Sequence, residues 1–116
     1  MADAVIYKIA GRQEWAAAEA AGRFDGAAID LADGYIHFST AGQVAETAAR
    51  HFAGRDDLVL VGVDTAAIAA ALKYEPSRGG ALFPHLYGPL PLSAVIVVNA
   101  LPLGPDGRHD FSGLLP

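Results

Sequence analysis

Residues 57–64 read DLVLVGVD, and this stretch indicates how the rest of the chain is arranged. Residues 58–63 are apolar without interruption. A strand with one face in water alternates apolar and polar residues, whereas a strand buried on both faces reads as a continuous apolar run. We therefore expect residues 58–63 to form a central strand that is covered on both faces.

One helix is predicted after this strand in the sequence and another before it. Asp64 can cap a helix over 65–72, TAAIAAAL, by accepting a backbone N–H of its first turn. Upstream, Thr40 and Gln43 have the spacing of a capping box and precede apolar residues at helical intervals. This pattern predicts a second helix from about 41 to 53.

The remaining segments do not repeat a fixed unit. Further strands are predicted over 4–10, 35–38 and 93–101, and a third helix over 12–21. Residues 73–75 are expected to be extended, because Pro76 follows them. Loops or turns are predicted over 23–34, 77–91 and 105–107. Strands that neither alternate evenly with helices nor group as a sandwich favour an α+β fold. We expect one compact α+β domain over residues 1–116 with about three helices.

Composition narrows the class of protein. The chain is 53% hydrophobic and 18% charged, so a packed core is expected and disorder is not. A net charge of -5 argues against broad nucleic-acid binding, which needs a basic face. The chain holds no cysteine, which excludes disulfides and thiolate chemistry. No long apolar segment or signal-peptide pattern is present, so we expect a cytoplasmic protein without a membrane span.

Five polar residues are candidates for a site. His37 and Ser39 lie in DGYIHFST, Glu75 precedes Pro76, and His85 and Tyr87 lie in FPHLYG. Each also has an ordinary structural interpretation. His37 would be a core residue, Ser39 a helix cap and Glu75 a solvated surface carboxylate. His85 and Tyr87 would belong to a hydrophobic loop that closes the core. Together they would form a polar pocket that can bind a small molecule, orient it and transfer protons, and Glu75 and His85 are the groups we expect to be catalytic.

A second interpretation of the same residues is a metal site. His37, Glu75 and His85 include the donors of a two-histidine, one-carboxylate triad. Their spacing is irregular and no short-spaced zinc motif is present. We therefore expect no tightly bound metal.

Six short segments follow one another over nearly the whole chain: IYKI near the start, EW at 14–15, DGYIHFST from 33, DLVLVGVD from 57, LKYE from 72 and FPHLYGPL from 83. In these segments and their order the chain resembles the bacterial family called domain of unknown function 952. The resemblance implies an ADP-ribosylation-like fold, which is a split mixed or antiparallel sheet around a cleft for a nicotinamide dinucleotide. The activity of the family is unassigned.

The resemblance also implies roles for individual residues. In enzymes of that fold a strand histidine and a hydroxyl two residues later hold the ribose, and His37 and Ser39 match this pair. A tyrosine stacks on the nicotinamide ring, and Tyr87 is the candidate. The late glutamate of that fold has no match, because the strand over 93–101 carries Asn99 and no acid.

The functional hypothesis is a pocket for a nucleotide or ribosyl ligand, with NAD or a related nucleotide as the ligand and ADP-ribosyl-type chemistry as the reaction. His37, Ser39 and Tyr87 are the ligand-binding candidates. A small-molecule binding protein without catalysis and a metal-dependent hydrolase that uses His37, Glu75 and His85 are the alternatives.

Overall fold

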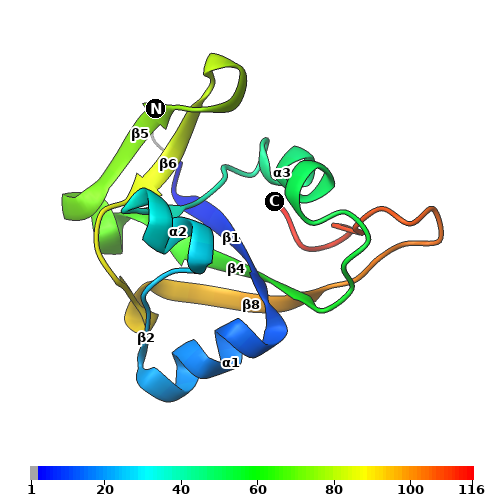
Figure 1. Ribbon diagram of the computed structural model, residues 1–116, viewed down its shortest axis with the longest axis horizontal. Helices are drawn as coiled ribbons and strands as arrows, with labels where there is room; N and C mark the ends of the chain where they lie inside the picture. Colours follow the sequence, from blue (N-terminus) through cyan, green and yellow to red (C-terminus); the bar gives the residue numbers. More distant parts are fainter. Residues whose placement is uncertain (1–2) are drawn as a thin grey trace.

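The main sheet of the protein has three antiparallel strands in the order β1-β4-β8. The computed structural model describes residues 3–116, apart from the side chain of Arg78. β1 is Val5–Gly11, β4 is Leu58–Asp64 and β8 is Val95–Leu101. The first six residues of β4 are buried, and β4 lies between the other two strands (Figure 1). The prediction of a central strand covered on both faces is confirmed.

Each face of this sheet packs against a different hydrophobic cluster. On one face, alternate strand residues such as Ile6 and Val61 meet Trp15 of α1, which is Arg12–Ala21. On the other face, Tyr7 and Leu60 meet Val44 of α3, which is Val44–His51. Because side chains alternate between faces along a strand, a continuous apolar run supplies both clusters at once.

A second sheet stands beside the first, also with three antiparallel strands, in the order β3-β6-β5. β3 is Ile36–His37, β5 is Leu72–Pro76 and β6 is Leu82–Leu86. The β5–β6 hairpin projects away from the main sheet (Figure 1). A short pair completes the strands, β2 (Arg23–Phe24) with β7 (Leu90–Pro91). The α+β class and the antiparallel strand pairing are therefore as expected.

The two larger sheets are joined by a backbone bridge. The N–H of Tyr7 in β1 donates to the carbonyl of Ser39 at 2.8 Å, and the N–H of Ser39 donates to the carbonyl of Tyr7 at 2.9 Å. This bridge places the end of the DGYIHFST segment against the main sheet. The residues that follow lead into α3, Val44–His51.

The prediction of a loop over 23–34 is wrong, because this segment contains the helix α2, Ala28–Asp33. The Asp30 carboxylate accepts a hydrogen bond from the Ala27 backbone N–H at 2.8 Å, which satisfies one free donor at the start of the helix. Gly34 ends the helix at φ 87°, a left-handed conformation that glycine adopts without strain. The helix has only 6 residues, too few to show a helical pattern in the sequence.

The helix predicted over 65–72 is a 3₁₀ helix over Thr65–Ala71. The predicted cap is present, since Asp64 accepts from the Ala66 N–H at 3.0 Å. A 3₁₀ helix rises about 2.0 Å per residue against about 1.5 Å for an α-helix, so the same residues span more distance before β5 begins at Leu72.

Three other segments differ from the prediction. The segment 77–91 is not only turns, since it contains β6 and β7 as well as the short 3₁₀ turn Arg78–Gly80. The helix expected from 41 begins at Val44, and only half of the capping box forms: Gln43 Oε1 accepts from the Thr40 N–H at 3.0 Å. The last strand begins at Val95, after the 3₁₀ turn Leu92–Ala94.

Among residues 3–116, no helix is long and apolar enough to cross a membrane.

Candidate functional site

One face of the β3-β6-β5 sheet collects most of the predicted site residues. His37 pairs with His85 in the register of β3 and β6, and Lys73 pairs with His85 in the register of β5 and β6. Residues that pair across antiparallel strands point to the same face, and so do residues two positions apart on one strand. The shared face therefore carries Phe83 and, on these strands or directly beside them, six residues with polar groups, which we call the histidine face: Tyr35, His37, Lys73, Glu75, His85 and Tyr87.

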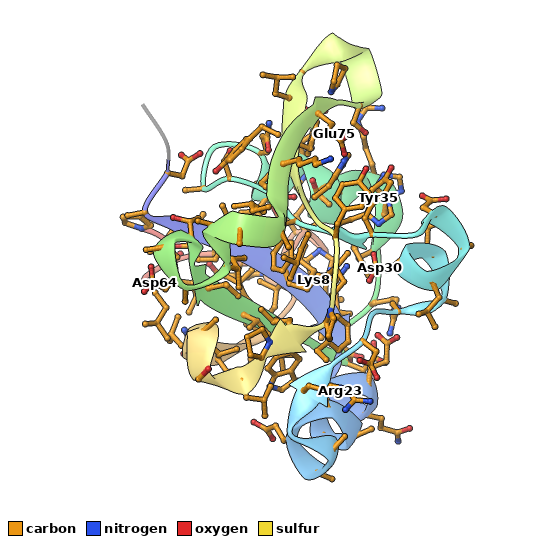
Figure 2. The ribbon with its side chains drawn as sticks, turned by 90° about the vertical axis from the view of Figure 1, so that its left-hand side faces the viewer. Lys8, Arg23, Asp30, Tyr35, Asp64 and Glu75 are labelled. Atoms are coloured by element: carbon orange, nitrogen blue, oxygen red, sulfur yellow. The ribbon has the colours of Figure 1, made fainter. Side chains whose placement is uncertain are left out.

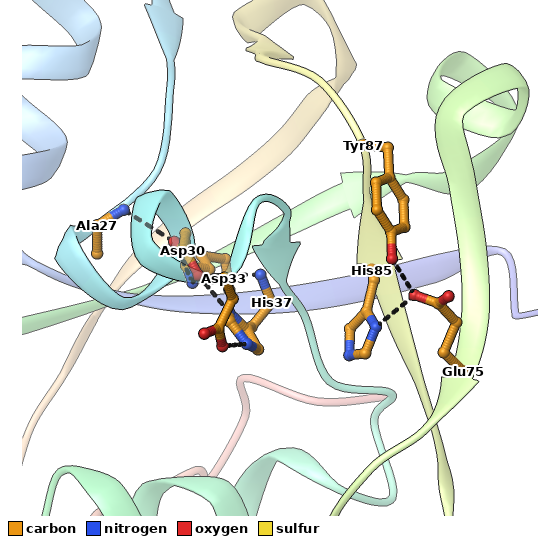
Figure 3. A network of polar contacts seen from close by, with 8 residues as sticks. Ala27, Asp30, Asp33, His37, Glu75, His85 and Tyr87 are labelled. Atoms are coloured by element: carbon orange, nitrogen blue, oxygen red, sulfur yellow. Dashed lines mark hydrogen bonds and ion pairs between the residues drawn. The ribbon is translucent and has the colours of Figure 1, made fainter.

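His85 is held by Glu75 on this face. His85 is only 3% exposed, and its Nδ1 lies 2.8 Å from Glu75 Oε1. The Tyr87 hydroxyl donates to the same Glu75 oxygen at 2.6 Å (Figure 3). The hydrogen bond from Tyr87, followed by that from His85, lowers the pKa of Glu75, and the bond to Glu75 raises the pKa of Tyr87 to about 12.

These contacts determine which atom of His85 is left for a ligand. An ionised carboxylate can only accept, so His85 Nδ1 carries the hydrogen that Glu75 receives. In the neutral ring, Nε2 then has a free lone pair and can accept a proton. The arrangement is that of a general base oriented by a carboxylate.

His37 lies between two carboxylates of α2. Its Nδ1 is 2.6 Å from Asp30 Oδ1, and its Nε2 is 2.9 Å from Asp33 Oδ2 (Figure 3). Both contacts are hydrogen bonds at the same time only when both ring nitrogens carry hydrogen, which is the cationic form of imidazole. The Asp33 side chain is 41% exposed, so this contact is the one that a ligand can displace.

Asp30 is the fixed partner of His37. Its side chain is 1% exposed and pairs with the buried ammonium of Lys8, with Nζ 2.9 Å from Oδ2. Burial alone would raise the pKa of Asp30, but the hydrogen bond from His37 and the charge of Lys8 outweigh it and hold the pKa well below its usual range. Figure 2 shows Lys8 of β1 and Asp30 of α2 on neighbouring elements. Asp30 therefore stays ionised and keeps His37 in place.

Aromatic contacts fill the space between the two histidines. The His37 and His85 rings lie 5.6 Å apart between centroids. Tyr35 stacks on His85 at 4.1 Å and lies 4.7 Å from the His37 ring. The expected proximity of His37, His85 and Glu75 is therefore observed.

A cleft of about 720 Å³ opens beside the histidines. Its lining includes His37, Ser39 and His85, so three of the five predicted residues face it. Glu75 and Tyr87 lie behind His85 and act on it through the contacts above. Pockets for small ligands commonly have about 300–1,000 Å³ and a few polar groups in an apolar lining.

Ser39 faces the cleft but is almost fully buried. Its Oγ lies 2.9 Å from Oγ1 of Thr47, a residue of α3. Its backbone forms the bridge to Tyr7 described above. Ser39 thus links the segment that carries His37 to both the main sheet and α3. Its hydroxyl contacts Thr47, and a hydroxyl oxygen can still accept a further hydrogen bond from a ligand.

Sequence reasoning missed Asp30, Asp33 and Tyr35. Asp30 and Asp33 lie in the segment that was predicted as a loop, although Asp33 precedes His37 by four residues. Lys8 gave a weak signal, since it is a lone charge in the apolar strand of residues 4–10. A buried lysine requires a carboxylate partner, which is the information that points to Asp30.

No group of three or more histidine or acidic side chains that could hold a metal ion occurs in the described part of the chain. Glu75 binds His85, and His37 binds Asp30, instead of converging on one point. The geometry therefore adds nothing to the triad interpretation of His37, Glu75 and His85.

The fold and the site define a small α+β protein that presents two carboxylate-held histidines at one cleft. The chain belongs to a family described as protein of unknown function (DUF952), whose model matches residues 9–98. No match was found among curated proteins.

Solved structures of a relative are available for comparison. The crystal structure of protein CC0527 from Caulobacter crescentus is 51% identical, with a TM-score of 0.88 over 93% of this chain and 95% of that chain. The solution NMR structure of CC0527 is 50% identical, with a TM-score of 0.87 over 97% of both chains. The likeness supports the fold over nearly the whole chain and carries no statement about activity.

Proposed function

We propose that the protein binds a nucleotide or ribosyl ligand, such as NAD, in the cleft, and that His85 transfers a proton there in an ADP-ribosyl-type reaction. The observation that carries the proposal is the pair of histidines. Their rings lie 5.6 Å apart, each has Nδ1 against a carboxylate, and both line one cleft. Two imidazoles that are oriented separately and share a cleft are suited to proton transfer.

The two histidines have different roles in this proposal. Glu75 orients His85 so that Nε2 accepts a proton from the attacking hydroxyl or water. His37 meets the ribose, because the exposed Asp33 is the partner that a ribose hydroxyl can replace at Nε2. The resemblance to ADP-ribosylation folds supports this role, since it matches His37 and Ser39 to the ribose-binding pair.

The position of Arg55 favours a ligand that carries a phosphate group. It lines the same cleft, and its guanidinium makes a fork-like pair with Asp57, from Nε and one Nη at 3.0 Å each. Both partners are exposed, so the pair has little net strength in water. A phosphate group of a nucleotide can compete for a guanidinium with the same fork geometry.

A specific observation favours binding without catalysis as the second candidate. Asn99, where an acid would be expected from the resemblance, lies on the edge strand β8 of the main sheet. The only carboxylate of the histidine face is Glu75, and it already accepts two hydrogen bonds. In a binding protein, the two histidines would recognise the ligand and no bond would be broken.

Thermal shift and calorimetry with NAD, ADP-ribose, AMP and nicotinamide test the proposal. We expect at least one nucleotide to stabilise the protein, and His85→Gln to bind it while losing nicotinamide release from NAD by about 10²–10⁴-fold. Glu19→Gln is the control, because Glu19 is exposed on α1 and lies outside the cleft lining. Binding without release would favour the second candidate, and no stabilisation by any nucleotide would refute both.

A further inference from the structure

Tyr35 contacts every other ring of the histidine face. Its centroid lies 4.1 Å from that of His85, 4.7 Å from that of His37 and 5.2 Å from that of Tyr87. Its plane is within 26° of the His85 plane, which is a stacked arrangement. Tyr35 is therefore the common neighbour of both histidine–carboxylate pairs.

The backbone around Tyr35 is held by the residue that holds His37. The Asp30 carbonyl accepts from the Gly34 N–H at 2.9 Å and from the Tyr35 N–H at 3.2 Å. The Asp30 carboxylate accepts from the His37 N–H at 3.0 Å. One residue of α2 thus sets the start of the segment that carries Tyr35 and His37.

Tyr35 lies behind the histidines and not on the cleft. In the described part of the chain, the cleft lining includes His37 and His85 but not Tyr35. Tyr35 instead lines a smaller hollow of about 260 Å³ together with Asp30, Ile36 and Leu86. Burial, followed by the carboxylates of Asp33 and Glu75, raises the pKa of its hydroxyl, so the ring stays neutral. A change at Tyr35 therefore alters the histidines without removing a cleft-lining side chain.

A single hydrogen bond does not fix the orientation of a ring. The contact to Glu75 fixes one atom of His85, and the Glu75 side chain is itself 35% exposed. The ring can still pivot about that contact, which would move Nε2. A stacked neighbour fixes the plane as well as the position, because tilting the ring would lose its contact area.

We propose that Tyr35 is a positioning residue, whose ring holds the plane of His85 and couples it to the His37 pair. The catalytic meaning of this coupling rests on the proposed function, whereas the coupling itself requires no ligand. Loss of the ring should let His85 sample several orientations. Loss of the hydroxyl alone should change little, because the stacked contact is made by the ring.

Nitrogen-15 NMR of the histidine rings tests the proposal on the protein without ligand. Tyr35→Phe keeps the stacked ring, and Tyr35→Leu removes it. Tyr74→Leu is the matched control, since Tyr74 lies on β5 with its side chain opposite to that of Glu75, where its hydroxyl donates to Asp3. The readouts are the tautomer of His85, the persistence of its Nδ1–H signal against exchange with water, and the nuclear Overhauser contact between the two histidine rings.

We expect wild type, Tyr35→Phe and Tyr74→Leu to show one His85 tautomer, a protected Nδ1–H and the ring-to-ring contact. Tyr35→Leu should lose all three while the backbone signals of β1, β4 and β8 stay in place. A protected Nδ1–H in Tyr35→Leu, or its loss in Tyr35→Phe, would overturn the proposal. Neither outcome depends on nucleotide binding, so a failed ligand screen would refute the proposed function and leave this result standing.

Discussion

His37 and His85 lie directly opposite each other on paired strands, and each turns Nδ1 to a carboxylate from a different element. Asp30 comes from α2 and Glu75 from β5. The first carboxylate is buried with a lysine, and the second is partly exposed and shared with Tyr87. The two histidines therefore have separate carboxylate partners, which allows each pair to be tested by its own substitution.

Glu75→Gln should impair His85 without unfolding the protein. The neutral amide is similar in shape but no longer requires His85 Nδ1 to carry the hydrogen, so the tautomer with a free Nε2 loses its preference. We expect nicotinamide release from NAD to fall by about 10²–10⁴-fold with little change in melting temperature. Glu19→Gln, an exposed change on α1, is the control. An unchanged rate of release in Glu75→Gln would show that Glu75 has no part in the reaction.

Asp30→Asn should destabilise the protein strongly. The substitution leaves the ammonium of Lys8 buried without its ionic partner, and breaking a buried pair in this way costs about 3–5 kcal/mol. Urea unfolding measures the change. Asp25→Asn is the matched control, because Asp25 pairs with Arg23 on the surface and such pairs are worth about 0–1 kcal/mol. Equal losses in the two variants would mean that the buried pair has no special weight.

The pair should also make stability depend on pH in the acid range. The pKa of Asp30 is lower in the folded protein than its unfolded value of about 3.9, so its contribution is fully present above that value. Stability should fall as pH decreases below about 4, because the unfolded chain then binds a proton that the folded protein excludes. The Lys8→Met, Asp30→Asn double variant should show a shallower decline in urea titrations over this range. An identical decline would assign the effect to other carboxylates.

Gly62→Ala should disturb the main sheet. A Cβ at this position would lie 2.7 Å from Val97 Cγ1, well inside normal contact distance. Overpacking of this kind typically costs about 1–3 kcal/mol, and thermal or urea unfolding would show it. Gly42→Ala is the control, since no heavy atom lies within 4 Å of the Cβ built there and its backbone is not left-handed. A Gly62→Ala protein as stable as wild type would mean that β8 moves aside at no cost.

The main sheet could be predicted from local pattern because the cause is local. Six successive apolar residues in β4 are enough to require cover on both faces. The 3₁₀ geometry of Thr65–Ala71 could not be predicted, because it depends on where β5 has to begin. The helix α2 was missed because it is short and because Asp30, its third residue, reads as a loop former in isolation.

The candidate site was predicted in part for a related reason. Histidine, glutamate and tyrosine are conspicuous in short segments, so His37, Glu75, His85 and Tyr87 could be selected from the sequence. Which of them touch is decided by the register of three strands, and the register is not written in any one segment. Asp30 and Tyr35 gain their importance only from that register and from the burial of Lys8.

Side chains alternate between the two faces of the sheet along β6, and this alternation limits how the protein can change during evolution. His85 and Tyr87 reach the histidine face because they are two positions apart and in phase with Glu75 across the hairpin. Loss or gain of one codon in β6 before His85 would turn both side chains to the opposite face, even though His85 and Tyr87 were retained. A lineage can therefore exchange side chains at this site one at a time, whereas a change in the length of the strand removes the whole arrangement in a single step.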